Sequence, residues 1–276
     1  MTDQRPRIET QLRSFFGFKS VPFARDLAPD QVFCTEAFDQ ALDRLRYLID
    51  RRGVGALFGA PGLGKSTLLR TWMGELGRAT HALCYVGDTA CSAVDLYRQI
   101  ARGFQLEPPY RKADVRREIK QRILKLGRVQ KLSAVLVIDD AHLLPAASLD
   151  ELRLLTSFDA DGCDELTLVL AGHPQLESNL RLAVHEALAQ RIVQRLRLRG
   201  WDAEEVERYL GFRLELAGCT ARLFLPDAVE AIARAARGLP RMIDRIAEHS
   251  LLIALAGRKR EIDADIVGRA VEEVQP

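Results

Sequence analysis

The octapeptide Gly-Ala-Pro-Gly-Leu-Gly-Lys-Ser at residues 59–66 restricts the possible folds of this chain more than any other segment, because it has the G-x-x-x-x-G-K-S spacing of a phosphate-binding loop. Its glycines let main-chain N–H groups turn inward around phosphate oxygens. The helix that follows directs the positive end of its dipole at the same anion. The apolar run 53–58 before the loop predicts a strand, and the spacing of apolar residues after it predicts a helix. This order of strand, loop and helix indicates a nucleotide site.

The residues expected to contact the nucleotide phosphates form one continuous segment: Gly59, Ala60, Pro61, Gly62, Leu63, Gly64, Lys65, Ser66 and Thr67. Lys65 is expected to reach the β- and γ-phosphates, and the Ser66 hydroxyl to coordinate Mg²⁺. Phosphoryl transfer also needs an acidic element after a second apolar strand, and Asp139-Asp140 follows the run 133–138. Asp139 is expected to hold the metal, and Asp140 to orient or deprotonate the attacking water. We therefore expect ATP as substrate and Mg²⁺ as cofactor.

The order of periodic segments predicts the fold class. Four apolar runs alternate with helical periodicity, which is typical of a parallel α/β sheet, and they occupy residues 53–58, 81–86, 133–138 and 165–171. Residues 195–199 alternate strictly between apolar and charged, which indicates an edge strand with one solvated face. From Trp201 onward only helical periods occur, at residues 203–216, 226–236, 240–256 and 263–274.

We therefore predict an α/β fold, a P-loop NTPase sheet core with a C-terminal all-α lid. The expected domains are an N-terminal arm at 1–34, a nucleotide-binding domain at 35–200 and a helical lid at 201–276. The run 81–86 places one strand between the phosphate loop and the acidic pair, as in P-loop ATPases that carry their own catalytic acid.

The arm is expected to be irregular and to pack on the core, because its aromatic residues are costly to leave in water. A sharper hypothesis is that Pro22 and Phe23 line the nucleotide base. The alternative is that they belong simply to the core.

Composition sets broad limits. The 276 residues are 47% hydrophobic and 28% charged with a net charge of +2, which is ordinary for a globular protein and indicates no partner by bulk charge. The N-terminus is polar, and no run approaches the roughly 18 apolar residues of a membrane span. The five cysteines are scattered and odd in number, which predicts reduced thiols in a cytoplasmic protein: Cys34, Cys84, Cys91, Cys163 and Cys219.

One segment has a strong local charge excess. Nine Lys and Arg residues stand against two acidic ones between residues 111 and 131, on a predicted helix whose other face is apolar. One interpretation is a solvated helix face. The other is sequence-independent contact with the phosphates of double-stranded DNA. The candidates for this contact are Arg111, Lys112, Arg116, Arg117 and Lys120.

Five ordered motifs resemble the ExeA/TnsC/TniB-type AAA+ ATPases along nearly the whole chain. They are Phe16-Gly17 with Pro22-Phe23, Glu151-Leu-Arg-Leu-Leu155, Ala171-Gly-His-Pro-Gln-Leu176, Gln190-Arg-Ile192 and Gly238-Leu-Pro-Arg-Met-Ile243. The resemblance implies that His173 is the sensor of the γ-phosphate. It implies that Arg191, or Arg195 in its place, is the arginine finger offered to a neighbouring subunit. It also implies that Arg241 on the lid is a second sensor.

The same resemblance implies a function. Subunits would assemble head to tail as a ring or helical filament with ATP at each interface, bind duplex DNA and recruit a transposase, and hydrolysis would end the assembly. One position departs from the family, which usually has Glu where this chain has Asp140. A carboxylate misplaced by about 1 Å can cost on the order of 100-fold in rate, so we expect slow hydrolysis.

Two alternatives stay open. The first is a secretion-pathway assembly ATPase of the ExeA type, whose relatives carry a membrane span and a wall-binding domain after the ATPase. The chain ends at Pro276 with neither, which favours the expectation of a DNA-directed role. The second is a scaffold or signalling NTPase that does not bind DNA.

Overall fold

The computed structural model describes residues 8–24, 31–158 and 165–274, which separate into two compact units. The first unit is an α/β unit of residues 36–61 and 65–198. The second is a helical unit, which contains the described residues up to Thr35, the tripeptide Gly62–Gly64 and the residues from Arg199 onward.

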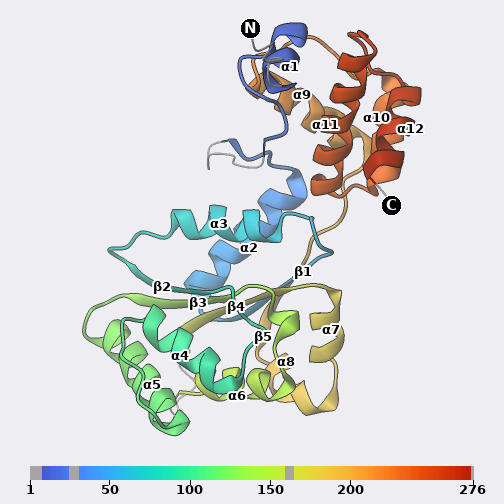
Figure 1. The fold of residues 1–276 in the computed structure, drawn as a ribbon. Helices are drawn as coiled ribbons and strands as arrows, with labels where there is room; N and C mark the ends of the chain where they lie inside the picture. The colour runs from blue at the N-terminus through green and yellow to red at the C-terminus, as the bar shows by residue number, and fades with distance from the viewer. Residues whose placement is uncertain (1–7, 25–30, 159–164, 275–276) are drawn as a thin grey trace, which may run out of the picture. The chain divides into compact units, whose positions relative to one another are not determined.

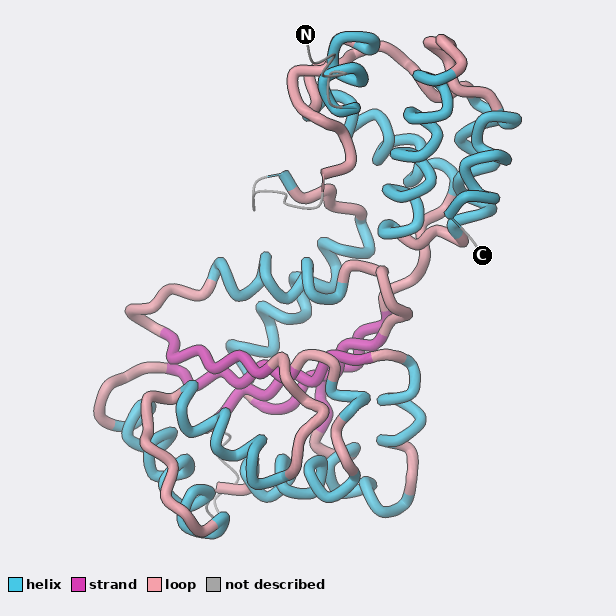
Figure 2. Tube along the Cα trace, viewed as in Figure 1, coloured by secondary structure: helices cyan, strands magenta, loops and turns pink. Residues whose placement is uncertain are grey.

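A parallel five-stranded sheet forms the centre of the α/β unit, as the sequence predicts (Figure 2). The strands have the order β2-β3-β4-β1-β5, and every neighbouring pair is parallel. They are β1 (Gly53–Phe58), β2 (His81–Val86), β3 (Ser133–Ile138), β4 (Leu166–Gly172) and β5 (Ile192–Arg197). β5 lies at an edge, as predicted, but it begins at Ile192 rather than Arg195, because its pairing with β1 already starts at Ile192 opposite Val54.

Helices cover both faces of this sheet (Figure 1). One face is covered by α2 (Glu36–Arg51) and α3 (Lys65–Glu75). The other is covered by α4 (Ala93–Gly103), α5 (Lys112–Arg128), α6 (Ala146–Thr156), α7 (Pro174–Leu180) and α8 (Glu186–Ala189). Two short 3₁₀ turns, η2 (Ala141–Leu143) and η3 (Ala183–His185), complete this unit.

Alternate residues of each central strand enter different cores. Val135 and Val137 of β3 pack with α2 and α3, whereas Leu136 packs with the helices of the opposite face. A strand buried on both sides must be apolar at every position, which is why 133–138 is a continuous hydrophobic run.

The helical unit contains α9 (Ala203–Leu216), α10 (Pro226–Ala236), α11 (Pro240–Ala256), α12 (Ala264–Val274) and an additional helix, α1 (Ile8–Phe16). The first three have the predicted bounds, and α12 begins one residue later than predicted. The expectation of an irregular lead was wrong for residues 8–16. They form a helix because one amphipathic turn buries Leu12 in the core of this unit.

Pro22 and Phe23 are also buried, and Phe23 belongs to the core of the helical unit. The Phe23 ring meets Phe224 edge to face with centroids 6.2 Å apart. The Arg213 guanidinium lies over the Phe23 ring and donates a hydrogen bond to the Ala24 carbonyl at 2.7 Å. These contacts place Phe23 in core packing, and its role toward a nucleotide base stays a prediction.

No helix within the described residues is both long enough and apolar enough to cross a bilayer. The four cysteines of the described residues are free thiols, of which Cys84 and Cys219 are buried and Cys34 is exposed. Cys163 lies outside the described residues.

An ion cluster joins α7 to the edge strand β5. Glu177 accepts hydrogen bonds from Arg197 and from Arg181. The hydrogen bond from Arg197 is the main reason that the pKa of Glu177 falls from 4.5 to about 2. A carboxylate with a lower pKa in the folded state stabilises the fold fully above pH 4.5, and this contribution disappears as the pH falls toward 2.

We therefore expect Glu177→Gln to lower the thermal unfolding temperature at pH 7 and to flatten its decline below pH 4.5, as followed by circular dichroism. Glu186→Gln in α8 is the matched control. Glu186 is exposed and accepts a hydrogen bond from the neutral side chain of Gln190. An unchanged pH profile in Glu177→Gln would show that the cluster contributes no pH-dependent stability.

Candidate active site

The phosphate loop connects the carboxyl end of β1 to the first turn of α3. Gly62 and Gly64 have φ angles of +83° and +87°, a left-handed conformation that residues with a Cβ rarely adopt. Lys65, the first residue of α3, is only 6% exposed. Its Nζ donates to the carbonyl oxygens of Gly59 at 2.9 Å and Ala60 at 3.1 Å. The lysine cation is therefore held inside the loop that the sequence identifies.

Ser66 and Asp139, which lie far apart in the sequence, meet beside this loop. The Ser66 hydroxyl donates to Asp139 Oδ2 at 2.9 Å. Asp139 is 5% exposed and accepts a second bond at the same oxygen from the hydroxyl of Tyr85, at 3.2 Å. A hydroxyl and a carboxylate are the hard oxygen donors that Mg²⁺ prefers, so these residues fit the expected metal.

Asp140 is held in an unusual backbone conformation. Its φ and ψ angles are +48° and +36°, in the left-handed region that Asp tolerates better than most residues. Its N–H donates to Asp139 Oδ1 at 2.9 Å, and its carbonyl accepts from the buried Thr89 hydroxyl at 2.9 Å. Hydrogen bonds therefore hold the main chain at both its N–H and its carbonyl, while the Asp140 side chain is half exposed.

Two histidines stand next to Asp140. The rings of His142 and His173 are stacked, with centroids 3.7 Å apart and planes inclined by 26°. His142 Nδ1 lies 3.8 Å from Asp140 Oδ1. Burial lowers the pKa of His173, and the nearby His142 and Lys65 lower it further. His173 is therefore the neutral imidazole at pH 7 and can donate or accept one hydrogen bond.

Sequence reasoning assigned no role to Tyr85, Thr89 or His142. The Asp-Asp-Ala-His order was visible, but the stacking of His142 on His173 depends on β3 and β4 being neighbours. Likewise Tyr85 reaches Asp139 only because β2 pairs with β3. No signal in the sequence specifies these neighbours.

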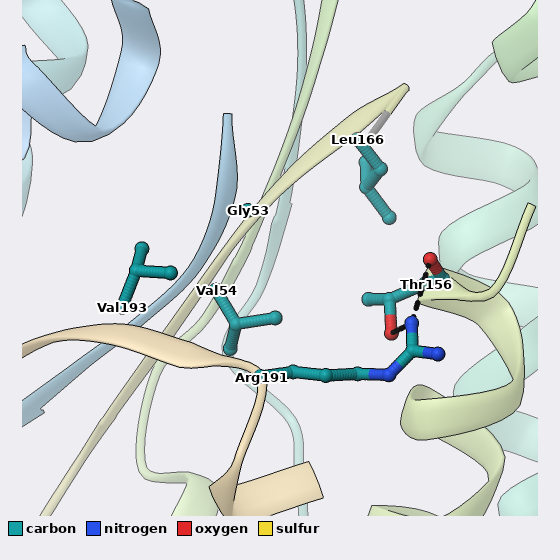
Figure 3. A pocket seen from close by; sticks show the side chains of 6 residues that line it. All are labelled: Gly53, Val54, Thr156, Leu166, Arg191 and Val193. Atoms are coloured by element: carbon teal, nitrogen blue, oxygen red, sulfur yellow. Dashed lines mark hydrogen bonds between the residues drawn. The ribbon is translucent and has the colours of Figure 1, made fainter. Parts of the chain in front are cut away.

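Arg191 lies at the other end of the strands from the phosphate loop, beside the amino end of β1. Its Nη1 donates to the Thr156 carbonyl at 3.2 Å, beside a cavity of about 140 Å³ (Figure 3). The residues lining the cavity are Gly53, Val54, Thr156, Leu166, Arg191 and Val193. Figure 3 shows the guanidinium directed at Thr156, with both dashed bonds ending on that residue.

The length of β1 separates this arginine from the phosphate loop. Arg191 precedes Ile192, which pairs with Val54 at the start of β1, whereas the loop begins after the end of that strand. Six residues of strand at about 3.3 Å each span about 20 Å. Arg195 lies farther along β5 opposite Ala56, and its guanidinium donates to the Ala189 carbonyl at 2.9 Å.

Arg241 is exposed in the first turn of α11, in the helical unit. Its expected sensor role stays a prediction.

The candidate DNA-binding residues make bonds within the chain. Lys112 and Arg116 both pair with Glu151, Arg117 pairs with Asp114, and Lys120 donates to the Ser157 carbonyl. Arg111 is exposed at the start of α5. Four of the five candidate cations thus make intramolecular contacts, and the three that pair with a carboxylate reduce the positive charge that α5 presents.

The parallel sheet and the loop give this chain the fold of P-loop NTPases, with a helical C-terminal region. Residues 48–180 match the family model described as AAA domain. The chain is 35% identical over 267 residues to "General secretion pathway protein A" of Aeromonas hydrophila. That match covers 94% of this chain and 48% of the relative, so the chain spans about half the length of that protein.

Solved structures share the fold at lower identity. Cdc6p from Pyrobaculum aerophilum superposes with a TM-score of 0.69 at 21% identity, over 91% of this chain and 70% of that one. The Aeropyrum pernix ORC2 protein gives 0.64 at 20%, over 91% and 71%. The Thermotoga maritima RuvB Holliday junction branch migration motor gives 0.60 at 22%, over 91% and 73%.

Proposed function

We propose that this protein is a Mg²⁺-dependent ATPase of the AAA+ type. The observation that carries the proposal is the 2.9 Å contact between Ser66 Oγ and Asp139 Oδ2 beside the buried Lys65. It brings a phosphate-binding cation and two metal-ligand oxygens together at the carboxyl edge of a parallel sheet, where open α/β folds bind their ligands.

Each residue then has a defined task. Lys65 would exchange its two loop carbonyls for phosphate oxygens, and Ser66 and Asp139 would hold Mg²⁺, which would supply neutralisation of charge on the phosphates. Asp140 orients the attacking water, and the neutral His173 hydrogen-bonds the γ-phosphate.

The side chain of Asp140 limits the rate. Its carboxylate is one methylene closer to the main chain than that of a glutamate, and the main chain itself is held by Thr89 and Asp139. The backbone therefore cannot advance to compensate. Slow hydrolysis suits a nucleotide switch better than a fast motor.

We expect the wild-type protein to hydrolyse ATP slowly, and only with Mg²⁺, in a phosphate-release assay. Asp140→Glu is expected to raise kcat by up to about 100-fold, because the longer side chain returns the carboxylate to the productive position. Asp140→Asn is expected to bind ATP with near wild-type affinity and to hydrolyse none.

Lys65→Ala serves as the control for binding, since it removes the cation that holds the phosphates. Mg²⁺-independent affinity for ATP in the wild type, or full affinity in Lys65→Ala, would overturn the proposed site. A turnover of Asp140→Glu equal to that of the wild type would instead overturn only the explanation for slow hydrolysis.

We also propose that the active site is completed by a second copy of the chain. Arg191 lies about 20 Å from the loop of its own chain, by the length of β1, so its guanidinium cannot serve its own nucleotide. Release of its hydrogen bonds to Thr156 would let it reach a neighbouring subunit's ATP as an arginine finger. Head-to-tail contacts of this kind generate rings or helical filaments.

Mixing two inactive variants tests this arrangement. Arg191→Ala and Lys65→Ala are each expected to lose ATP hydrolysis. Mixed in equal amounts they are expected to regain part of it, because some interfaces then pair an intact loop with an intact arginine. Arg195→Ala is the matched control for the identity of the finger. If the mixture of Arg191→Ala with Lys65→Ala stays inactive while the mixture of Arg195→Ala with Lys65→Ala regains hydrolysis, Arg195 is the finger. If neither mixture regains hydrolysis, the composite site is refuted.

The work coupled to hydrolysis has two candidates. The 35% identity to a general secretion pathway protein extends over 94% of the chain and supports the assembly of a secretion apparatus. Regulation of DNA transposition, with a transposase as partner and a cytoplasmic location, rests on the family resemblance in the sequence alone. A scaffold or signalling role without turnover is the third possibility, and the hydrolysis assay above decides it.

Binding to duplex DNA separates the first two candidates. For the secretion role we expect no ATP-dependent binding of a labelled random duplex even at 50 mM salt, where phosphate contacts are strongest. A DNA regulator that makes 6–10 phosphate contacts would bind with ATP and lose about 10³–10⁵-fold in affinity between 50 and 200 mM salt. Arg111→Ala with Arg117→Ala would weaken such binding if α5 contributes, and Arg44→Ala with Arg51→Ala in α2 is the matched control.

A further inference from the structure

Three metal-binding side chains converge beside the phosphate loop. Asp140, His142 and His173 each offer a ligand atom, and these atoms lie within 4.8 Å of one another. Asp140 and His142 follow β3 and are separated by one residue, whereas His173 follows β4. The register pairs Ile138 with Leu170, so the two segments leave the sheet side by side.

The contacts of His142 indicate a ring nitrogen that is available to a cation. His142 Nδ1 is buried and has no hydrogen-bond partner, and its side chain is 12% exposed. The nearest carboxylate oxygen, Asp140 Oδ1, is 3.8 Å away, which is too far for a hydrogen bond. A buried nitrogen without a partner is costly, and a ligand that joined it to Asp140 would remove the cost.

The spacing fits a tetrahedral metal ion. Two ligands at about 2.0–2.1 Å from a tetrahedral ion lie about 3.4 Å apart. The 3.8 Å between His142 and Asp140 needs a change of a few tenths of an ångström, and the ligand atom of His173, within 4.8 Å of the others, reaches the ion by a side-chain rotation. The two rings are stacked with an inclination of 26°, so one of them must turn out of the stack to direct both ring nitrogens at one ion.

We propose that Asp140, His142 and His173 form a binding site for a transition-metal ion of the Zn²⁺ class, distinct from the Mg²⁺ site at Ser66 and Asp139. Two imidazole nitrogens and one carboxylate oxygen match the preferences of Zn²⁺ and Co²⁺, whereas Mg²⁺ prefers oxygen ligands alone. Three protein ligands leave the fourth tetrahedral position open.

Occupation of this site would inhibit hydrolysis, and this part rests on the proposed function. Asp140 cannot orient the attacking water while its carboxylate coordinates a metal. The ion would therefore act as a brake on ATP turnover while the Ser66–Asp139 pair stays unchanged.

Direct metal binding tests the site without reference to ATP. Co²⁺ is titrated into the full chain, free of affinity tags, and its visible d–d absorption is recorded. We expect one Co²⁺ per chain with a tetrahedral spectrum and no sulfur charge-transfer band. His142→Gln is expected to weaken binding by at least about 10-fold, with Asp140→Asn as a second ligand variant. His249→Ala is the matched control, because His249 contacts Glu273 in the helical unit.

The outcomes decide the proposal. Equal Co²⁺ affinity in the wild type and His142→Gln, a thiolate band, or complete displacement of Co²⁺ by excess Mg²⁺ would each refute it. Circular dichroism melts verify that both ligand variants fold. In the ATPase assay, we expect Zn²⁺ to inhibit the wild type at least about 10-fold more strongly than His142→Gln. If the chain binds Co²⁺ as expected but hydrolyses no ATP, the metal site stands and the proposed enzyme function fails.

Discussion

The hydrogen bond between Ser66 and Asp139 depends on a general property of parallel sheets. All strands present their carboxyl ends at one edge, so a helix that starts after β1 and an acidic pair that follows β3 arrive at the same place even though β4 lies between these strands. The geometry of the candidate site is therefore a consequence of the strand order. A change in that order would separate the lysine loop from its acidic partner without altering either motif.

The electrostatics of this edge follow from burial. Lys65 is almost fully inside the protein and its charge is satisfied by two carbonyl oxygens of its own loop. Burial lowers the pKa of His173, and His142 and this same cation lower it further. One cluster thus combines a fixed positive charge, two carboxylates and a neutral imidazole, which are the groups that a γ-phosphate and a water molecule require.

The two ends of the strands carry different side chains. The lysine, the aspartates and the histidines lie at the carboxyl ends, whereas Arg191 lies beside Thr156 at the amino ends. Since a six-residue strand of about 20 Å lies between them, one chain cannot bring both to a single phosphate. Strand length, rather than any loop, is the physical reason that the proposed finger must act on another copy.

The sequence by itself determined the phosphate loop, the buried parallel strands and the change to helices after residue 200, because glycine spacing and hydrophobic period are local properties of the chain. It did not reveal the helix α1, whose single buried Leu12 is a weak periodic signal. Only the tertiary structure decided that Tyr85 and Thr89 support the acidic pair and that His142 stacks on His173. These contacts depend on which strands are neighbours, and strand order arises from long-range packing that no local pattern encodes.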